Sequence, residues 1–363
     1  MRFLHCADLH LDSKLTANLD SKRARERKTE LLNTFVKMVD YAARENVDVV
    51  LIAGDLFDTN KISVTAKSTV RAAVENHPDI KFLYLKGNHD NNDFISEEDE
   101  IPENLLMFDN TWKAYHFGNI DVYGIELDKD NSSVASDALV CDSSKFNIVM
   151  LHGQVEKSAV KDKAERINIS GYKNKGVDYL ALGHIHAYKK EALDARTTYC
   201  YPGCLEGRGF DECGEHGFVI VDVDENTGNY THRFIPFAKR HLYELRVDVS
   251  DCNDSISMQN RVEECIKDAG IKSDDLIKIV LVGEVDVECE KDENLILSKF
   301  EDSFYFAKIV DETGVRVDIE DYLLDESLKG EFVRTVLSDE SMDETERGEV
   351  IRIGLKALAG EEI

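Results

Sequence analysis

The chain has 363 residues, of which 42% are hydrophobic and 32% charged, with only four prolines and a formal net charge of −28. This length predicts more than one folded domain, and the composition argues against long disordered linkers. No stretch approaches the roughly 20 apolar residues of a membrane span, and the opening MRFLHCADLH lacks a signal-peptide pattern. A cytoplasmic protein without membrane contact is therefore predicted.

The negative charge is concentrated toward the C-terminus. Residues 241–363 hold 33 Asp and Glu against 14 Lys and Arg, so 19 of the 28 excess negative charges lie there. Binding to nucleic acid usually requires a basic surface. We therefore do not expect the last third of the chain to be the main phosphate-binding surface.

Five short apolar runs in the first half of the chain predict buried strands. They are MRFLHCA, VDVVLIA, IKFLYLK, FNIVML and VDYLALG. Between the first two runs, Leu31, Phe35 and Val39 recur at helical spacing, and a second helix is expected at about residues 63–76. Strands that alternate with amphipathic helices predict an α/β fold in which helices pack on a sheet.

The pattern changes after His186. The pieces TTYCYPG, HGFVIVDVD and YTHRFIPF predict an antiparallel section that closes a first domain at residues 1–237. Residues 238–310 are expected to form a small α+β cap, because a helical RVEECIKDAG lies between the strand-like HLYELRVDV and IKIVLVGEVDV. Residues 311–363 are expected to be a C-terminal helical segment, with helices at ESLKGEFVRTVL and TERGEVIRIGLKALAG.

Polar residues of metal-ligand type follow each of the five predicted strands. They are Asp8 and His10, Asp55, Asn88, His152, and His184 with His186. Taken singly, each has an ordinary explanation, such as a helix cap, a turn or a histidine bonded to the backbone. The loops beyond the carboxyl ends of strands converge in open α/β folds, so the full series indicates one metal centre. In extended backbone, Asp8 and His10 would point the same way.

The order Asp-x-His, Gly-Asp-x-x-Asp, Gly-Asn-His-Asp, His, Gly-His-x-His resembles the calcineurin-like metallophosphoesterase family over about residues 1–236. The resemblance implies a four-layer β-sandwich flanked by helices, two divalent metal ions and phosphoester hydrolysis. It implies one metal held by Asp8, His10, Asp55 and His186, and a second held by Asp55, Asn88, His152 and His184. Asp55 would bridge the two ions, and His89 would be catalytic, donating to the phosphate or protonating the leaving group.

The ligand set of oxygens and imidazoles suits manganese, with iron or zinc as alternatives, better than calcium. Within the family, the stretches HCADLHLDS, FLYLKGNHD and YPGCLEGRGFDECGEHGF look most like SbcD-type DNA repair exonuclease subunits. That resemblance implies a manganese-dependent DNA nuclease, a homodimer, and a coiled-coil ABC-type ATPase partner that engages a C-terminal helical segment. Exonuclease and endonuclease action both stay open.

Two alternatives to a nuclease remain. One is a phosphodiesterase or phosphatase that acts on nucleotides or other small phosphoesters, which the acidic composition favours. The other is a metal-bound scaffold whose acidic C-terminal region recruits a partner.

Several other residues allow two interpretations. Arg208 either clamps a phosphate bidentately or forms a surface ion pair with Glu206, Asp211 or Glu212. Asp58 either orients a ligand histidine or caps the helix that follows. The cations at the start of the first long helix predict a solvated basic face, with phosphate contact as the alternative; they are Lys22, Arg23, Arg25, Arg27 and Lys28. Cys200, Cys204, Cys213 and His216 lack a C-x-x-C pair, so ordinary side chains are expected there rather than a zinc site.

Overall fold

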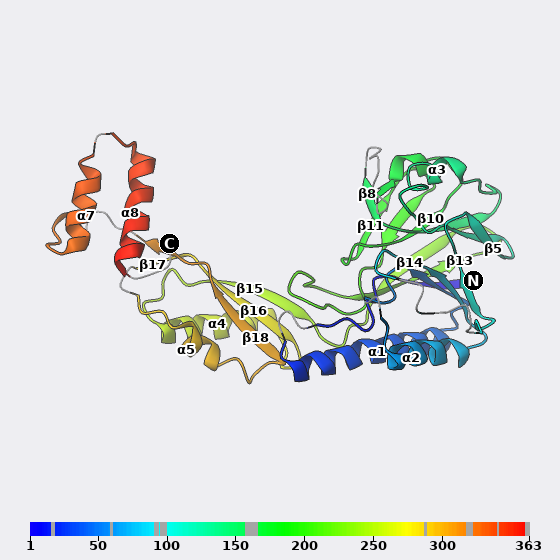
Figure 1. Cartoon of the computed structure of the whole chain (residues 1–363), viewed down its shortest axis with the longest axis horizontal. Helices are drawn as coiled ribbons and strands as arrows, with labels where there is room; N and C mark the ends of the chain where they lie inside the picture. The colour runs from blue at the N-terminus through cyan, green and yellow to red at the C-terminus, as the bar shows by residue number, and fades with distance from the viewer. Residues whose placement is uncertain are drawn as a thin grey trace. The chain divides into compact units, whose positions relative to one another are not determined.

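The protein is described by a computed structural model that covers residues 1–15, 19–58, 61–90, 94, 100–156, 166–286, 289–316, 322–339 and 341–359. The chain divides into two compact units, Met1–His241 and Leu242–Ile363 (Figure 1). Each unit is described by itself below.

Two six-stranded sheets form the centre of the first unit among the described residues. The first sheet has the order β14-β13-β1-β2-β3-β4, with bounds β14 (Tyr230–Pro236), β13 (Gly217–Val223), β1 (Arg2–Cys6), β2 (Val49–Ala53), β3 (Lys81–Leu85) and β4 (Leu105–Met107). The second has the order β11-β12-β10-β7-β6-β5, with bounds β11 (Lys189–Ala192), β12 (Thr198–Tyr201), β10 (Tyr179–Gly183), β7 (Phe146–His152), β6 (Ile120–Gly124) and β5 (Lys113–Phe117). In the first sheet, β1, β2, β3 and β4 run parallel to one another. In the second sheet, β12, β10, β7 and β6 run parallel to one another.

The sheets and helices of this unit stack in four layers. Apolar side chains of both sheets, such as Val49 and Ile148, share one buried cluster, so the sheets pack face to face. The helices α1 (Ser21–Arg44) and α2 (Val64–Glu75) cover the first sheet, and α3 (Ala135–Ala138) with a 3₁₀ turn at Ile169–Tyr172 lies on the side of the second (Figure 1). A short ribbon pairs β8 (Gln154–Glu156) with β9 (Arg166–Asn168). The predicted four-layer α/β sandwich is confirmed.

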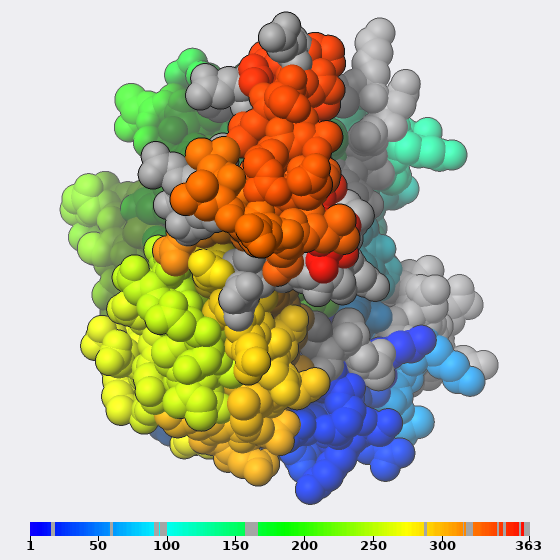
Figure 2. Space-filling model, turned by 90° about the vertical axis from the view of Figure 1, so that its left-hand side faces the viewer, coloured from blue at the N-terminus to red at the C-terminus, as the bar shows by residue number. Residues whose placement is uncertain are grey.

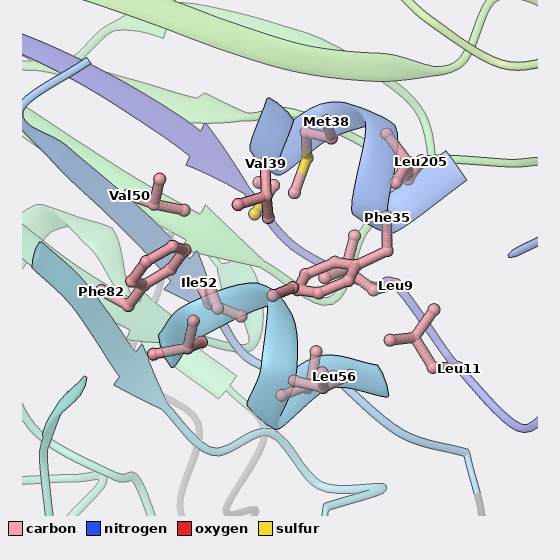
Figure 3. Close-up of a cluster of buried hydrophobic side chains, with 14 of the residues drawn as sticks. Leu9, Leu11, Phe35, Met38, Val39, Val50, Ile52, Leu56, Phe82 and Leu205 are labelled. Atoms are coloured by element: carbon pink, nitrogen blue, oxygen red, sulfur yellow. The ribbon is translucent and has the colours of Figure 1, made fainter. Parts of the chain in front are cut away.

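Helix α1 begins where Asp20 accepts hydrogen bonds from the backbone of Lys22 and Arg23. Figure 3 shows Phe35, Met38 and Val39 of this helix directed at side chains of β2 and β3, which follows from their spacing of three and four residues. Burial of each large apolar side chain stabilises the fold by about 1.5–3 kcal/mol. Ser63 caps α2 by accepting from the backbone N–H of Ala66.

The second unit contains a parallel sheet of order β15-β16-β18, with bounds β15 (Leu242–Asp248), β16 (Leu276–Val282) and β18 (Phe306–Asp311). The helices α4 (Ser255–Ala269) and α5 (Glu293–Ser298) share its buried cluster, and β17 (Glu284–Asp286) pairs with β19 (Gly314–Arg316). Helices α7 (Leu328–Leu337) and α8 (Glu344–Ala359) pack through a small apolar cluster of their own. They appear in orange and red in Figure 2.

Helices α7 and α8 correspond to the two predicted terminal helices. Gly360, the last residue of the second predicted helix, lies outside the described residues. The predicted boundary after residue 237 lies just before the division at His241. The predicted boundary after residue 310 falls inside β18, and it would separate β17 from its partner β19. The division into a cap at 238–310 and a helical segment at 311–363 stays a prediction.

No helix in the described ranges is both long and apolar enough to cross a membrane. All eight cysteines lie in the described residues, and none of them forms a disulfide. Cys204 Sγ lies 3.2 Å from His216 Nδ1, but the clusters of three or more ligand-type side chains found among the described residues contain no cysteine.

Candidate metal centre

All seven residues predicted as ligands lie at or just past the carboxyl ends of parallel strands. Asp8 and His10 follow β1, Asp55 follows β2, Asn88 follows β3, His152 ends β7, and His184 and His186 follow β10. The first three strands belong to one sheet and the last two to the other, so the side chains meet where the ends of both sheets approach. Backbone bonds join these loops: Asp8 N–H donates to Gly54 O and His10 N–H to Asp55 O, at 3.0 and 2.9 Å.

One group of side chains consists of Asp8, His10 and His186, whose ligand atoms lie within 4.8 Å of one another. His10 Nε2 lies 3.2 Å from His186 Nε2. It also lies 3.7 Å from Asp55 Oδ2. Asp8, His10 and Asp55 are buried.

A second group consists of Asp8, Asp55 and His152. His152 Nε2 lies 3.3 Å from Asp55 Oδ2 and 3.0 Å from Asn88 Oδ1. His184 Nδ1 lies 3.3 Å from the same Asn88 oxygen. Asp55 Oδ2 therefore lies near a histidine of each group, 3.7 Å from His10 Nε2 and 3.3 Å from His152 Nε2, and Asp8 belongs to both groups.

The backbone that carries these residues is unusual. Four of the predicted ligands have positive φ without being glycine: Asp8 at 51°, His10 at 43°, Asp55 at 52° and His184 at 103°. Such conformations cost on the order of 1–3 kcal/mol each and cluster at functional sites. The expectation that Asp8 and His10 converge through extended backbone is wrong, since both are left-handed. Their side chains nevertheless reach the same group.

Three glycines permit the loops to approach this closely. A Cβ at Gly54, which has φ 92°, would lie 2.1 Å from His152 Nδ1, and a Cβ at Gly87 would lie 2.2 Å from Asp55 Oδ1. At Gly183 it would lie 1.9 Å from Ala53 O. Any side chain at these positions would displace a predicted ligand or the strand beside it.

The Asp90 carboxylate holds the loop after β2 in place. It accepts hydrogen bonds from the backbone N–H groups of Leu56, Phe57 and Gly87, at 3.1, 2.9 and 3.0 Å. These bonds tie the Asp55 and Asn88 loops together. Sequence reasoning assigned no role to Asp90.

Burial and pairing shift the pKa values of the central groups. Burial raises the pKa of Asp8 to about 6 and lowers that of His10. Burial alone would raise the pKa of Asp55 and lower that of His152. Their mutual hydrogen bond and charge outweigh it, so the pKa of Asp55 falls and that of His152 rises to about 9.

The donor set fits divalent cations. His10 Nδ1 faces the Asp58 carboxylate, with Oδ1 3.4 Å away. If this nitrogen carries the proton, the lone pair of His10 Nε2 points at His186 Nε2, an arrangement that a cation between them would stabilise. Two nitrogens that bind the same ion, each at about 2.1 Å, would be separated by about 3.0–3.4 Å. His10 Nε2 and His186 Nε2 are 3.2 Å apart.

Asp58 contacts two histidines. Its Oδ1 lies 2.9 Å from His89 Nδ1 and 3.4 Å from His10 Nδ1, and Ser13 Oγ donates to its Oδ2 at 2.8 Å. Burial alone would raise its pKa, but the bonds from His10 and Ser13 lower it to about 2. The helix-cap alternative is wrong, because Ser63 caps α2.

Arg208 is 17% exposed and forms an ion pair with Glu212, with Nη2 and Oε1 2.7 Å apart. The structure contains the predicted ion pair, but both of its side chains are mostly buried instead of lying on the surface. Arg208 Nη1 also lies 3.5 Å from Asp58 Oδ2. The Glu212 carboxylate contacts His186 Nδ1 at 2.7 Å. Sequence reasoning missed this second contact, for which a lone acidic residue in a loop is no signal.

The basic start of α1 differs from the prediction at one residue. Arg27 is only 1% exposed, and its guanidinium pairs with Glu30 and Glu206. It is therefore neither part of a solvated face nor available to a phosphate. Lys28 pairs with Asp12 at 2.6 Å.

The parallel strands of both sheets thus end in carboxylates, an amide and imidazoles, which are side chains of the kind that bind divalent metal ions. Residues 1–188 match the family model described as calcineurin-like phosphoesterase. The chain belongs to this family, which uses a dinuclear metal centre.

Three curated relatives extend the comparison beyond the matched domain. The uncharacterized metallophosphoesterase YhaO of Bacillus subtilis is 28% identical over 300 residues, covering 78% of this chain and 72% of that protein. The DNA double-strand break repair protein Mre11 of Saccharolobus solfataricus is 26% identical over 286 residues, 72% of each chain. A subunit of the nuclease SbcCD of Staphylococcus epidermidis is 23% identical over 298 residues, 72% of this chain and 76% of that one. The resemblance to the family and to SbcD-type proteins is confirmed.

Proposed function

We propose that this protein is a metal-dependent DNA nuclease that hydrolyses phosphodiester bonds in DNA repair, as an exonuclease and with endonuclease action open. The convergence of seven ligand-type side chains from five strand ends carries the proposal. The similarity to Mre11 and to one component of the nuclease SbcCD supports DNA as the substrate.

In this proposal, each cation has four protein ligands, with Asp55 shared. Asp8, His10, Asp55 and His186 hold the first, and Asp55, Asn88, His152 and His184 hold the second. When bound, the cations would neutralise the charge of the phosphoester and activate a water molecule. Manganese is the proposed metal, with iron and zinc as alternatives, because the ligands are oxygens and imidazoles without thiolate.

His89 is the proposed catalytic residue. Its side chain is 48% exposed, so it can reach a substrate, while Nδ1 is held 2.9 Å from Asp58 Oδ1. When both ring nitrogens are protonated, Nδ1–H donates to that carboxylate, and Nε2–H can donate to a phosphate oxygen or give its proton to the leaving alkoxide. Asp58 thereby keeps the ring oriented.

Arg208 is the proposed contact for a substrate phosphate, but its pairing with Glu212 limits this role. Only Nη1, which lies 3.5 Å from Asp58, is not engaged by the Glu212 carboxylate in the described contacts. A phosphate would therefore be met by one edge of the guanidinium rather than by a free bidentate fork.

The proposal includes a partner. The staphylococcal relative is named as one subunit of a nuclease, and we propose a coiled-coil ABC-type ATPase as the partner here. The helical pair α7 and α8, which exposes Leu328 and Ile353, is the proposed docking segment (Figure 2). A homodimer and a cytoplasmic location, where eight free cysteines persist in reduced form, complete the proposal.

A phosphodiesterase or phosphatase for nucleotides or other small phosphoesters is the alternative function. The net charge of −28 favours it, because acidic surfaces repel a polyanion.

Degradation of linear duplex DNA and of a small aryl phosphodiester, each with manganese, tests the proposal. Wild type and His89→Gln are compared with His116→Gln, which changes a histidine exposed in β5. We expect DNA degradation by wild type and His116→Gln, and a loss of about 100- to 10,000-fold in His89→Gln. Cleavage of the small diester with no action on DNA would establish the alternative. Equal DNA degradation by all three proteins would refute the assignment of His89.

A further inference from the structure

His186 has two possible tautomers, and only one of them can bind a cation through Nε2. That nitrogen faces His10 Nε2 within the first ligand group. It has a lone pair available only if the ring proton sits on Nδ1. The groups around Nδ1 therefore decide whether His186 can act as a ligand.

Two groups compete for His186 Nδ1. Glu212 Oε1 lies 2.7 Å away and can only accept a hydrogen bond. Arg208 Nη2 lies 3.3 Å away and can only donate one. Acceptance by Glu212 puts the proton on Nδ1, whereas donation by Arg208 would put it on Nε2. The shorter contact, which joins the ring to an ionised acceptor, favours Glu212.

Arg208 is kept from the imidazole because Glu212 engages it. Arg208 Nη2 donates to Glu212 Oε1 at 2.7 Å, and the backbone N–H of Arg208 donates to Oε2 at 2.8 Å. Glu212 Oε1 thus accepts from both Arg208 and His186, which accounts for the closeness of the two donors. Both carboxylate oxygens are needed as acceptors in this arrangement.

The position of Glu212 is fixed by its own backbone. Its N–H donates to Gly209 O at 2.9 Å, and its carbonyl accepts from His216 Nε2 at 2.7 Å. The residue is buried. Arg208 Nη1 extends the chain of contacts to Asp58, 3.5 Å away, which orients His10 and His89.

We propose that Glu212 is a positioning residue that selects the metal-binding tautomer of His186 and withholds Arg208 from the imidazole. This inference rests on the proposed function, because it takes His186 as a ligand of the first cation. Carboxylates that accept from a ligand histidine typically change metal affinity by about 10- to 100-fold when they are replaced.

Glu212→Gln is the variant that tests this role. Glutamine keeps the shape but has one acceptor oxygen instead of two, so it cannot serve both His186 Nδ1 and the three donor groups of Arg208, which are the backbone N–H, Nε and Nη2. Asp211→Asn is the matched control, because it removes the same charge from the adjacent exposed residue of the same loop. The midpoint of thermal unfolding without metal verifies that both variants are folded.

Manganese binding to the full chain is measured by calorimetry and electron paramagnetic resonance. We expect wild type and Asp211→Asn to bind two ions, and Glu212→Gln to bind one of them about 10- to 100-fold more weakly. In metal-free protein with ¹⁵N-labelled histidine, the His186 resonances, assigned with His186→Gln, should show Nδ1 protonated in wild type and less so in Glu212→Gln.

The outcomes separate this inference from the proposed function. If wild type binds no pair of ions, the proposed metal centre fails. If wild type binds the pair and Glu212→Gln matches it in both affinities and in the His186 resonances, the role of Glu212 is overturned while the metal centre stands.

Discussion

Two buried polar clusters of the first unit differ in how their charges are compensated. The first cluster, which we call the ligand cluster, consists of Asp8, His10, Asp55, Asn88, His152, His184 and His186. Neither Asp8 nor Asp55 forms an ion pair with a lysine or arginine among the described residues. The second cluster, which we call the ion cluster, consists of Arg27, Glu30, Thr34, Glu206, Lys239 and Arg240.

In the ion cluster, opposite charges and matched donors meet. Arg27 Nη1 donates to Glu30 Oε2 at 2.8 Å, and Arg240 Nη2 donates to Glu30 Oε1 at 2.7 Å. Glu206 Oε1 accepts from Thr34 Oγ1 and from the backbone of Lys239, at 2.7 and 2.8 Å. Burial alone would raise the pKa of Glu30, but its basic partners lower it to about 2. This cluster is complete without any added group.

In the ligand cluster, by contrast, carboxylate oxygens and imidazole nitrogens converge, and several of the residues that carry them have positive φ. A buried cluster in which each carboxylate is paired with a cation holds chain segments together, whereas buried carboxylates without a lysine or arginine partner are suited to a metal cation. Changes in the ion cluster should therefore affect stability, and changes in the ligand cluster should affect metal binding and activity.

The largest effect is expected from Asp55→Asn, because Asp55 Oδ2 lies near a histidine of each group and is the proposed bridge between the two cations. Loss of one bridging charge should remove roughly 4 kcal/mol of transition-state stabilisation, which is a loss of at least about 1,000-fold in kcat/KM. Steady-state hydrolysis with manganese measures it, with Asp211→Asn as control. Activity within tenfold of wild type would contradict the shared position of Asp55.

In the ion cluster, Arg27→Met should leave the buried Glu206 carboxylate without its arginine partner, whereas Glu30 keeps Arg240 and Lys239. Breaking a buried pair typically costs about 3–5 kcal/mol, so the midpoint of thermal unfolding should fall while manganese binding at 20 °C persists. Arg25→Met, which changes an exposed arginine of the same helix, should alter stability by no more than about 0.5 kcal/mol. Equal midpoints for both variants would mean that the ion cluster does not stabilise the fold.

Manganese itself should stabilise only proteins with an intact ligand cluster. At about 100 times the dissociation constant, a bound ion adds about 2.7 kcal/mol. We expect thermal unfolding midpoints to rise with manganese in wild type and Arg27→Met, and to rise less in Asp55→Asn. A chelator should reverse the rise. A similar rise in all three would place the stabilising ion outside the ligand cluster.

The smallest effect concerns a buried group outside both clusters. Burial lowers the pKa of His5 to about 3 from its ordinary 6.5. Between these values the unfolded chain binds a proton that the folded protein does not. Stability is therefore lost as the pH falls below 6.5, by up to about 1.4 kcal/mol per pH unit.

His5→Gln should reduce this pH dependence between pH 7 and pH 5, whereas the exposed His116→Gln should retain it. Unfolding midpoints at half-unit intervals of pH measure the slopes. Parallel profiles for wild type and His5→Gln would show that another group dominates acid destabilisation.

Local sequence determined the five strands that precede the candidate ligands, the main helices and the identity of those ligands, whereas strands such as β5, β6 and β18 were not predicted. Apolar runs such as VDVVLIA form β-structure because their side chains are buried on both faces. Leu31, Phe35 and Val39 form one face of α1 because their spacing matches the helical repeat. The polar residues after these strands meet because parallel strands end at the same edge.

Only the tertiary structure decided which polar side chains are paired. Arg27 lies among cations in the sequence, yet it is buried against Glu206, 179 residues away. Asp58 meets two histidines, and Glu212 meets His186, through loops that the two sheets bring together. The left-handed backbone of Asp8 and His10 likewise depends on bonds to the neighbouring loop. Such contacts join distant segments across packed layers, and no local spacing encodes them.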